Sequence, residues 1–163
     1  MREERIAVFP GSFDPVTLGH LNIIERAAAL FDRVIVAVVP NGEKKHPMFT
    51  DEEKLTLMRL SVAHLPNVEA ALWNGLLTDF AQERGARFLV RGVRSGADFD
   101  AEYPLSLIYR DVSGGALETV LLGAEPRLQH ISSTMAREMI RYHQELKKYL
   151  PAAAAEWITE KKG

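Results

Sequence analysis

A serine, a glycine and a histidine near the start of the chain lie where an apolar strand would pass into an amphipathic helix. The run 6–9 is typical of a short buried strand, and apolar residues recur at helical spacing over 21–31. Ser12 offers a hydroxyl, Gly19 lets a ligand approach the backbone, and His20 offers an imidazole. The start of a helix presents free N–H groups and partial positive charge to an anion. The pattern predicts a phosphate site; the stretch alone leaves a strand–turn–helix with a packed histidine as the alternative.

Further polar side chains follow predicted strands or open a predicted helix. They are Lys45 with its neighbour Lys44, Arg91 with Arg94, and Ser132, Ser133 and Thr134 with Arg137. Because the carboxyl ends of parallel strands share one edge of a sheet, we expect these groups to converge with Ser12 and His20 on a polyphosphate. Each has a structural alternative: the lysines could be solvated, the arginines could pair with Asp98 or Asp100, and the hydroxyls could only cap a helix.

The elements that must position these residues alternate between strand and helix patterns. Strands are expected at 6–9, 34–39, 68–72, 87–90 and 119–122. Helices are expected after Thr50, at 77–84, at 99–112, after Ser132 or Ser133, and from Pro151 to Trp157. The alternation predicts an α/β fold in a single domain over residues 1–163, with a five-stranded parallel sheet flanked by helices and a C-terminal helix.

Several residues mark where these helices begin and end. Thr50 can cap its helix with Glu53 as the capping-box partner, and Gly85 can close the helix 77–84. Asp98 is a candidate N-cap for the next helix. Pro104 is awkward inside that helix, so we expect it in the first turn or at a kink.

Composition narrows the class of protein. The chain has 163 residues, a formal net charge of −2 and no cysteine. The charge argues against a broad nucleic-acid-binding surface, and the lack of cysteine excludes disulfides, thiolate metal sites and cysteine nucleophiles. No apolar run approaches the ~20 residues that span a bilayer, and a strand follows the first residues directly. We therefore expect a cytoplasmic protein with no membrane partner.

Two motifs in this order resemble the signatures of the nucleotidyltransferase superfamily. Gly11-Ser12-Phe13-Asp14-Pro15 with Thr17-x-Gly19-His20 is similar to the (H/T)xGH signature, and Ile131-Ser132-Ser133-Thr134-x-x-Arg137 is similar to ISSTxxR. Between them, Lys45-x-x-Met48-Phe49, Arg91-Gly92-Val93-Arg94 and Ala97-Asp98-Phe99 resemble the bacterial phosphopantetheine adenylyltransferases. The resemblance runs from about Ile6 to Arg141 and implies a Rossmann-like doubly wound fold.

The resemblance also implies a reaction. The family transfers the adenylyl group of ATP to 4′-phosphopantetheine and forms dephospho-coenzyme A and pyrophosphate. The acceptor phosphate, with a second pKa of ~6, is already largely anionic at neutral pH, so no general base is needed. We expect direct in-line attack on the α-phosphate, with Mg²⁺ brought by the ATP phosphates because the sequence shows no carboxylate cage.

Residue roles follow from the resemblance. Catalytic roles are implied for Ser12, His20, Lys45 and Arg91, and contacts with 4′-phosphopantetheine for Ser12, Lys45, Leu77 and Arg91. ATP contacts are implied for Ser12, Phe13, His20, Gly92, Val93, Arg94, Glu102, Leu128, Gln129, His130, Ile131, Ser132, Ser133 and Thr134. Lys45 is preferred to Lys44 because it precedes Met48 by three residues, as the family lysine does.

Some positions depart from the family pattern. Lys54 stands where an arginine is common, Leu128-Gln129-His130 replaces a triplet with an aromatic residue, and Tyr109 replaces a small polar residue. These departures leave the details of adenine stacking and of the acceptor pocket open, but not the reaction.

Two rival functions remain. One is another nucleotidyltransferase, a cytidylyltransferase or a nicotinate-mononucleotide adenylyltransferase; the other is a catalytically silent nucleotide-binding module. The family also implies a homo-oligomer, commonly a hexamer, and feedback binding of coenzyme A.

Overall fold

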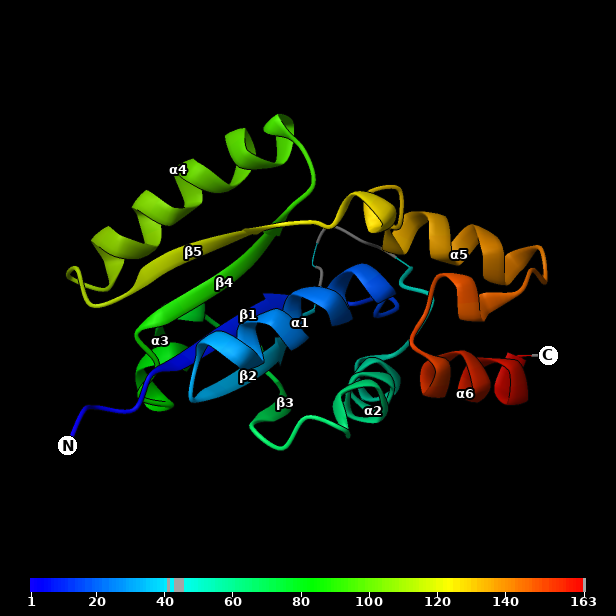
Figure 1. Cartoon of the computed structure of the whole chain (residues 1–163), viewed down its shortest axis with the longest axis horizontal. Helices are drawn as coiled ribbons and strands as arrows, with labels where there is room; N and C mark the ends of the chain where they lie inside the picture. Colours follow the sequence, from blue (N-terminus) through cyan, green and yellow to red (C-terminus); the bar gives the residue numbers. More distant parts are fainter. Residues whose placement is uncertain (41, 43–45, 163) are drawn as a thin grey trace.

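A five-stranded parallel sheet forms the centre of the protein in the computed structural model, which describes residues 1–40, 42 and 46–162. The strands are β1 (Ile6–Gly11), β2 (Arg33–Val38), β3 (Val68–Leu72), β4 (Phe88–Val93) and β5 (Glu118–Gly123). Their order across the sheet is β3-β2-β1-β4-β5 (Figure 1). The expected Rossmann-like α/β fold is confirmed.

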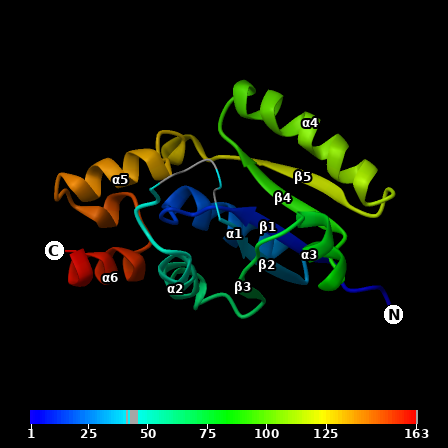
Figure 2. The ribbon, with the colours of Figure 1, turned by 180° about the vertical axis from the view of Figure 1, so that it is seen from behind.

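Helices cover both faces of this sheet (Figures 1 and 2). They are α1 (Leu18–Leu30), α2 (Asp51–Val62), α3 (Leu77–Glu83), α4 (Gly96–Val112), α5 (Ser133–Arg141) and α6 (Ala152–Lys162), with short 3₁₀ turns η1 (Pro126–Leu128) and η2 (Leu146–Lys148). Buried side chains of α1, α2, α5 and α6 share one core, and α3 contributes to the core on the other face. Among the described residues, no helix is long and apolar enough to cross a membrane.

β1 and β4 separate towards their carboxyl ends, at the topological switch point of the sheet, where the strand order reverses. β1 and β2 pair along their whole length, from Ile6 with Arg33 to Gly11 with Val38. By contrast, β1 pairs with β4 only at Ala7–Phe88 and Val8–Leu89. The carboxyl ends of β1 and β4 therefore open a crevice at the topological switch point, which is where open α/β sheets bind ligands.

The predicted caps are mostly confirmed. Thr50 and Glu53 form a reciprocal capping box at α2, and Gly85 follows α3 with a positive φ of 68°. Of the two candidate serines, Ser132 caps α5 by accepting from the Met135 N–H. Pro151 lies just before α6, and its carbonyl accepts from the Ala155 N–H.

The segment around α4 differs from the expectation. β4 runs on to Val93, so Arg91 lies within the strand and not after it. Ser95 caps α4, whereas Asp98 accepts from the Arg94 backbone N–H, so the N-cap predicted at Asp98 is wrong. Pro104 lies in the helix interior and not in the first turn; its side chain is exposed, where water can solvate the carbonyl that the missing N–H leaves free.

Candidate active site

The Thr17-x-Gly19-His20 motif is the capping box of α1. Thr17 is the N-cap, and its hydroxyl accepts from the His20 backbone N–H at 3.3 Å. In return, Nδ1 of His20 accepts from the Thr17 backbone N–H at 3.0 Å. Histidine here takes the place that glutamate usually fills in such a box. The motif therefore fixes the imidazole at the first turn of the helix, facing the crevice.

The hydrogen bond at Nδ1 sets the protonation state of His20. Because Nδ1 accepts, the proton of the neutral ring lies on Nε2. Loss of solvation on burial is the main cause that lowers the pKa of His20 to about 4, and the positive charges of Arg91 and Arg94 contribute. At neutral pH, His20 is thus a neutral donor through Nε2.

Phe13 holds the other side of the imidazole. The rings of Phe13 and His20 meet edge to face with centroids 5.0 Å apart. Phe13 has a positive φ of 46°, which folds its ring over Gly11. A Cβ at Gly11 would lie 2.7 Å from Cζ of Phe13, so this turn requires glycine there.

Arg91, within β4, is hydrogen-bonded through three of its nitrogens to two neighbouring elements. Its Nε and Nη2 donate to the two carboxylate oxygens of Glu102, at 3.0 and 2.8 Å. Its Nη1 donates to the Pro10 carbonyl at 2.7 Å, across the gap between β4 and β1. Arg91 is therefore fixed beside the last residues of β1.

Arg94 joins the same crevice to the second signature. Its Nη1 donates to the Ile131 carbonyl at 3.2 Å, and its own carbonyl accepts from Nε2 of Gln129 at 2.7 Å. Nε of Arg94 lies 3.7 Å from Asp98. Of the acids named as alternatives, Asp98 does pair with Arg94, while Arg91 pairs with Glu102 instead.

The second signature is bound to the first through the polar groups at the start of α5. The Ser133 hydroxyl donates to the Pro15 carbonyl at 2.8 Å. Arg137 donates to the Asp14 carbonyl at 2.8 Å and to the Thr134 hydroxyl at 3.2 Å. Arg137 does not line the cavity, so we interpret it as a structural contact of the signature and not as the phosphate ligand that the sequence suggested.

Asp14 is a residue that the sequence analysis did not single out. It is 1% exposed, and its carboxylate accepts from the backbone N–H groups of Met48 and Phe49, at 3.1 and 2.9 Å. Nη1 of Arg137 lies 3.8 Å from the same carboxylate. Asp14 thus joins the first loop, the segment before α2, and α5. Its place inside the first signature was the available signal.

A cavity of about 320 Å³ lies between these groups. The predicted site residues that line it are Ser12, Phe13, His20, Arg91, Gly92, Arg94, Glu102, Leu128, Ile131, Ser132 and Ser133. The cavity is also lined by residues for which the sequence predicted no role in the site: Phe9, Pro10, Gly11, Thr17, Gly19, Ile23, Asp98 and Ala124. A Cβ at Gly92 would lie 3.1 Å from Cγ1 of Ile23, so glycine there keeps β4 close to α1.

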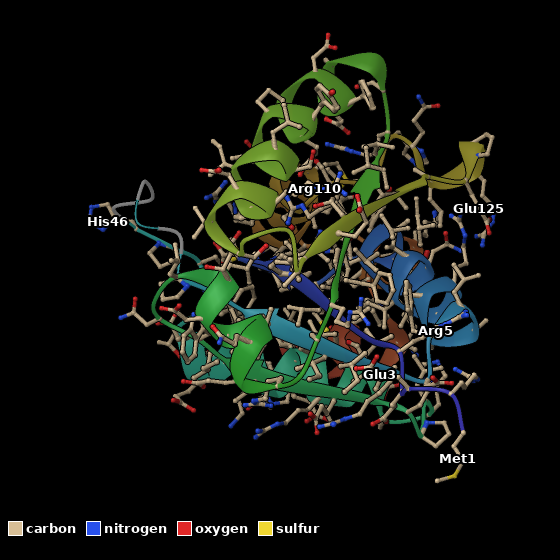
Figure 3. The ribbon with its side chains drawn as sticks, turned by 90° about the vertical axis from the view of Figure 1, so that its left-hand side faces the viewer. Met1, Glu3, Arg5, His46, Arg110 and Glu125 are labelled. Carbon is tan, nitrogen blue, oxygen red and sulfur yellow. The ribbon has the colours of Figure 1, made fainter. Side chains whose placement is uncertain are left out.

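Five other predicted residues do not line this cavity. They are Val93, Gln129, His130, Thr134 and Leu77. Leu77 opens α3 and packs with the core on that face of the sheet. Lys45 and its neighbour Lys44 lie outside the described residues, and His46 beside them is exposed at the periphery of the molecule (Figure 3).

Comparison with known proteins agrees with the two motifs. The family model described as Cytidylyltransferase-like matches residues 8–139. A phosphopantetheine adenylyltransferase of Symbiobacterium thermophilum is 44% identical over 155 residues, covering 95% of this chain and 94% of the relative. The phosphopantetheine adenylyltransferase of Heliobacterium modesticaldum is 41% identical over 158 residues, covering 97% and 93%.

A solved structure is similar in fold alone. It is described as that of a candidate nicotinate-nucleotide adenylyltransferase from Vibrio parahaemolyticus, with a TM-score of 0.74 and 17% identity over 98% of this chain and 94% of the other. The sequence relatives are far more similar, and they share one name. With both signatures at one cavity and this identity over nearly its whole length, the chain belongs to the phosphopantetheine adenylyltransferase family of cytidylyltransferase-like proteins.

Proposed function

We propose that the protein transfers the adenylyl group of ATP to 4′-phosphopantetheine, forming dephospho-coenzyme A and pyrophosphate. The observation that carries this proposal is the convergence of both signatures with Arg91 and Arg94 on one cavity at the switch point of the sheet. The family relationship supports the choice of acceptor.

The chemistry is an in-line displacement between two anionic substrates. An oxygen of the acceptor phosphate forms a bond to the α-phosphorus of ATP while the bond to the bridging oxygen breaks and pyrophosphate leaves. The acceptor phosphate has a second pKa of about 6, so it attacks without a general base. Catalysis therefore depends on positioning and on stabilising the charge that develops at the α-phosphate.

Each cavity group has a part in that displacement. His20 donates a hydrogen bond from Nε2 to an α-phosphate oxygen, which a neutral ring can do without a proton transfer. Arg91 holds the acceptor phosphate, and Arg94 with the start of α5 holds the nucleotide. Ser12 follows β1 directly and lines the same cavity.

Lys45 and Leu77 complete the proposal on the acceptor side. Lys45 would bridge the acceptor phosphate and the α-phosphate, and Leu77 would line the pantetheine pocket. Lys45→Ala should then damage turnover far more than Lys44→Ala, and the reverse order would move the role by one residue.

Mg²⁺ belongs to the proposal as a partner of the ATP phosphates. Among the described residues, no cluster of three histidine, aspartate or glutamate side chains gathers that could hold a metal ion. The donor set therefore fits an ion bound mainly by phosphate oxygens and water, where it supplies charge neutralisation. His20 and the two arginines act on phosphate oxygens directly.

We also propose a cytoplasmic homo-oligomer, a hexamer by family, that binds coenzyme A as a feedback ligand. The large apolar side chains exposed along α4 support assembly. Large side chains exposed there are Phe99, Tyr103, Leu105, Leu107, Ile108 and Val112.

Pyrophosphate release tests the reaction. Purified protein with ATP and Mg²⁺ should release pyrophosphate only when 4′-phosphopantetheine is added, with dephospho-coenzyme A identified by mass. CTP in place of ATP, and nicotinate mononucleotide in place of the acceptor, are the controls for the rival transferases. Faster turnover with either control would overturn the assignment, and ATP binding with no turnover on any acceptor would favour a silent module.

A further inference from the structure

Two side chains of α1 hold the chain where it leaves β5. Nη1 of Arg26 donates to the Gly123 carbonyl at 2.7 Å and to Oδ1 of Asn22 at 3.3 Å. Nδ2 of Asn22 donates in turn to Oε1 of Glu125 at 2.9 Å. Figure 3 shows Glu125 at this end of β5, close to α1. None of these three side chains lines the cavity, so any effect that they have on a ligand is indirect.

The Glu125 carboxylate is engaged at both oxygens. Oε1 accepts from Asn22, and Oε2 accepts from Nε of Arg127 at 2.8 Å. The hydrogen bond from Asn22, followed by that from Arg127, lowers the pKa of Glu125, so the carboxylate is ionised at neutral pH. The pair with Arg127 is exposed and local, and such pairs stabilise little. The contact with Asn22 is therefore the one that joins η1 to α1.

Backbone hydrogen bonds lead from Glu125 to the cavity. The Leu128 N–H donates to the Glu125 carbonyl at 2.9 Å, and the Ile131 N–H donates to the Leu128 carbonyl at 3.0 Å. The Ile131 carbonyl accepts from Nη1 of Arg94 at 3.2 Å. Leu128 and Ile131 are buried and line the cavity. A shift of Glu125 would therefore move one wall of the cavity and the carbonyl that holds Arg94.

We propose that Glu125 is a positioning residue for ATP, acting through η1 from outside the cavity. This inference rests on the proposed function, which gives Arg94 and the start of α5 to the nucleotide, and deepens it. Asn22 fixes Glu125 against α1, and Glu125 fixes the turn that presents Leu128 and Ile131. Without this anchor, the ligand itself would have to order the turn, and that ordering costs binding free energy.

Substrate affinities separate this role from a merely structural one. By calorimetry, Glu125→Ala should raise the Kd for ATP by about fivefold, while the KM for 4′-phosphopantetheine stays within about twofold. Glu125→Gln keeps an oxygen that can accept from Asn22 and should restore most of the affinity for ATP. Glu25→Ala is the matched control on α1, because Glu25 is exposed, pairs with His64 and does not line the cavity.

A double-mutant cycle shows whether Asn22 and Glu125 act as one unit. Asn22→Ala should raise the Kd for ATP about as much as Glu125→Ala does, and the double variant should differ from either single variant by less than about twofold. Independent multiplicative effects of the two substitutions would overturn the proposal. So would an unchanged Kd for ATP in Glu125→Ala, or an equal rise in the KM for the acceptor.

Binding of ATP is measured without the acceptor, so it does not depend on the acceptor's identity. A wild-type protein that binds ATP but does not use 4′-phosphopantetheine would contradict the proposed function alone, and the comparison of Kd values would still decide the role of Glu125. Urea denaturation checks that each variant is folded, and Asn22→Ala gives the same readout with Glu125 intact.

Discussion

The imidazole of His20 enters the proposed reaction as a donor that carries no charge of its own. Its Nδ1 is occupied by the Thr17 N–H, so only Nε2–H faces the cavity. Because burial lowers its pKa, the folded chain binds a proton less readily than the unfolded chain. Stability is therefore independent of this group above its unfolded pKa of about 6.5 and falls as the pH drops from there towards about 4.

Titration of the free protein tests this protonation state. Nitrogen NMR of the histidine rings should show His20 as the Nε2–H tautomer from pH 8 down to about 5, with protonation only near pH 4. His64, which is exposed beside Glu25 and lies away from the cavity, serves as the internal reference for assigning the ring signals. A His20 ring that protonates near pH 6.5 would contradict the assigned tautomer.

Substitution of His20 tests its share of catalysis. His20→Ala removes one preorganised donor from the α-phosphate and should lower kcat by about 10²–10³-fold. His64→Ala is the matched control and should keep kcat within about twofold, because His64 pairs with Glu25 away from the cavity. Circular dichroism checks the fold of both variants. Wild-type turnover in His20→Ala would remove His20 from the mechanism.

Among the elements, the strands and most helix caps were predictable from the sequence, and the polar contacts between elements were not. Continuous apolar runs such as 34–39 identify strands buried on both faces, and the structure buries residues 34–38 of this run completely. β4 extends past its apolar run to Val93 because its backbone pairs with β5 as far as Val93 and Gly123. Local pattern cannot show such a contact, which joins residues far apart in the chain.

Arg137 illustrates the same limit at α5. An arginine one turn after a run of hydroxyls is typical of an anion site, but its donors here are turned to Asp14 and Thr134. The folded structure buries the Asp14 carboxylate, which accepts from the Met48 and Phe49 N–H groups, and a buried carboxylate is stabilised by a nearby cation. The sequence cannot show this need, because Asp14 and Arg137 are far apart in the chain.

Removal of this cation should therefore cost stability. Arg137→Ala deletes the hydrogen bond to the Asp14 carbonyl and leaves the 1% exposed Asp14 carboxylate with less compensation, so the free energy of unfolding should fall by about 2–3 kcal/mol. Urea denaturation measures the change. Arg141→Ala, on the same helix and paired at the surface with Glu138, should cost less than about 1 kcal/mol. Equal losses in the two variants would refute the structural role of Arg137.

For the whole molecule, α4 is the element whose packing is incomplete in a single chain. It buries no residue, and large apolar side chains are exposed along its length. Figure 1 shows this helix at the edge of the fold, beside β5. At the same time it supplies Glu102 and Asp98 to the arginines of the cavity. An apolar face of this kind indicates contact with another protein surface, and a second copy of this chain is the partner that we propose.

Ile108→Glu tests that assembly and its link to the site. Ile108 is 53% exposed, so the substitution should leave the folding of one chain nearly unchanged but place a charge in an apolar contact between copies. Sedimentation should then show a smaller particle than the wild type. Because α4 also holds Arg91 through Glu102, the KM for the acceptor should rise in parallel as assembly is lost.

Leu30→Glu is the matched control: Leu30 is 57% exposed at the end of α1, away from α4, and the change should alter neither particle size nor KM. An Ile108→Glu protein with unchanged mass would show that copies of this chain do not meet through α4, and loss of mass without loss of acceptor affinity would separate assembly from the positioning of Arg91.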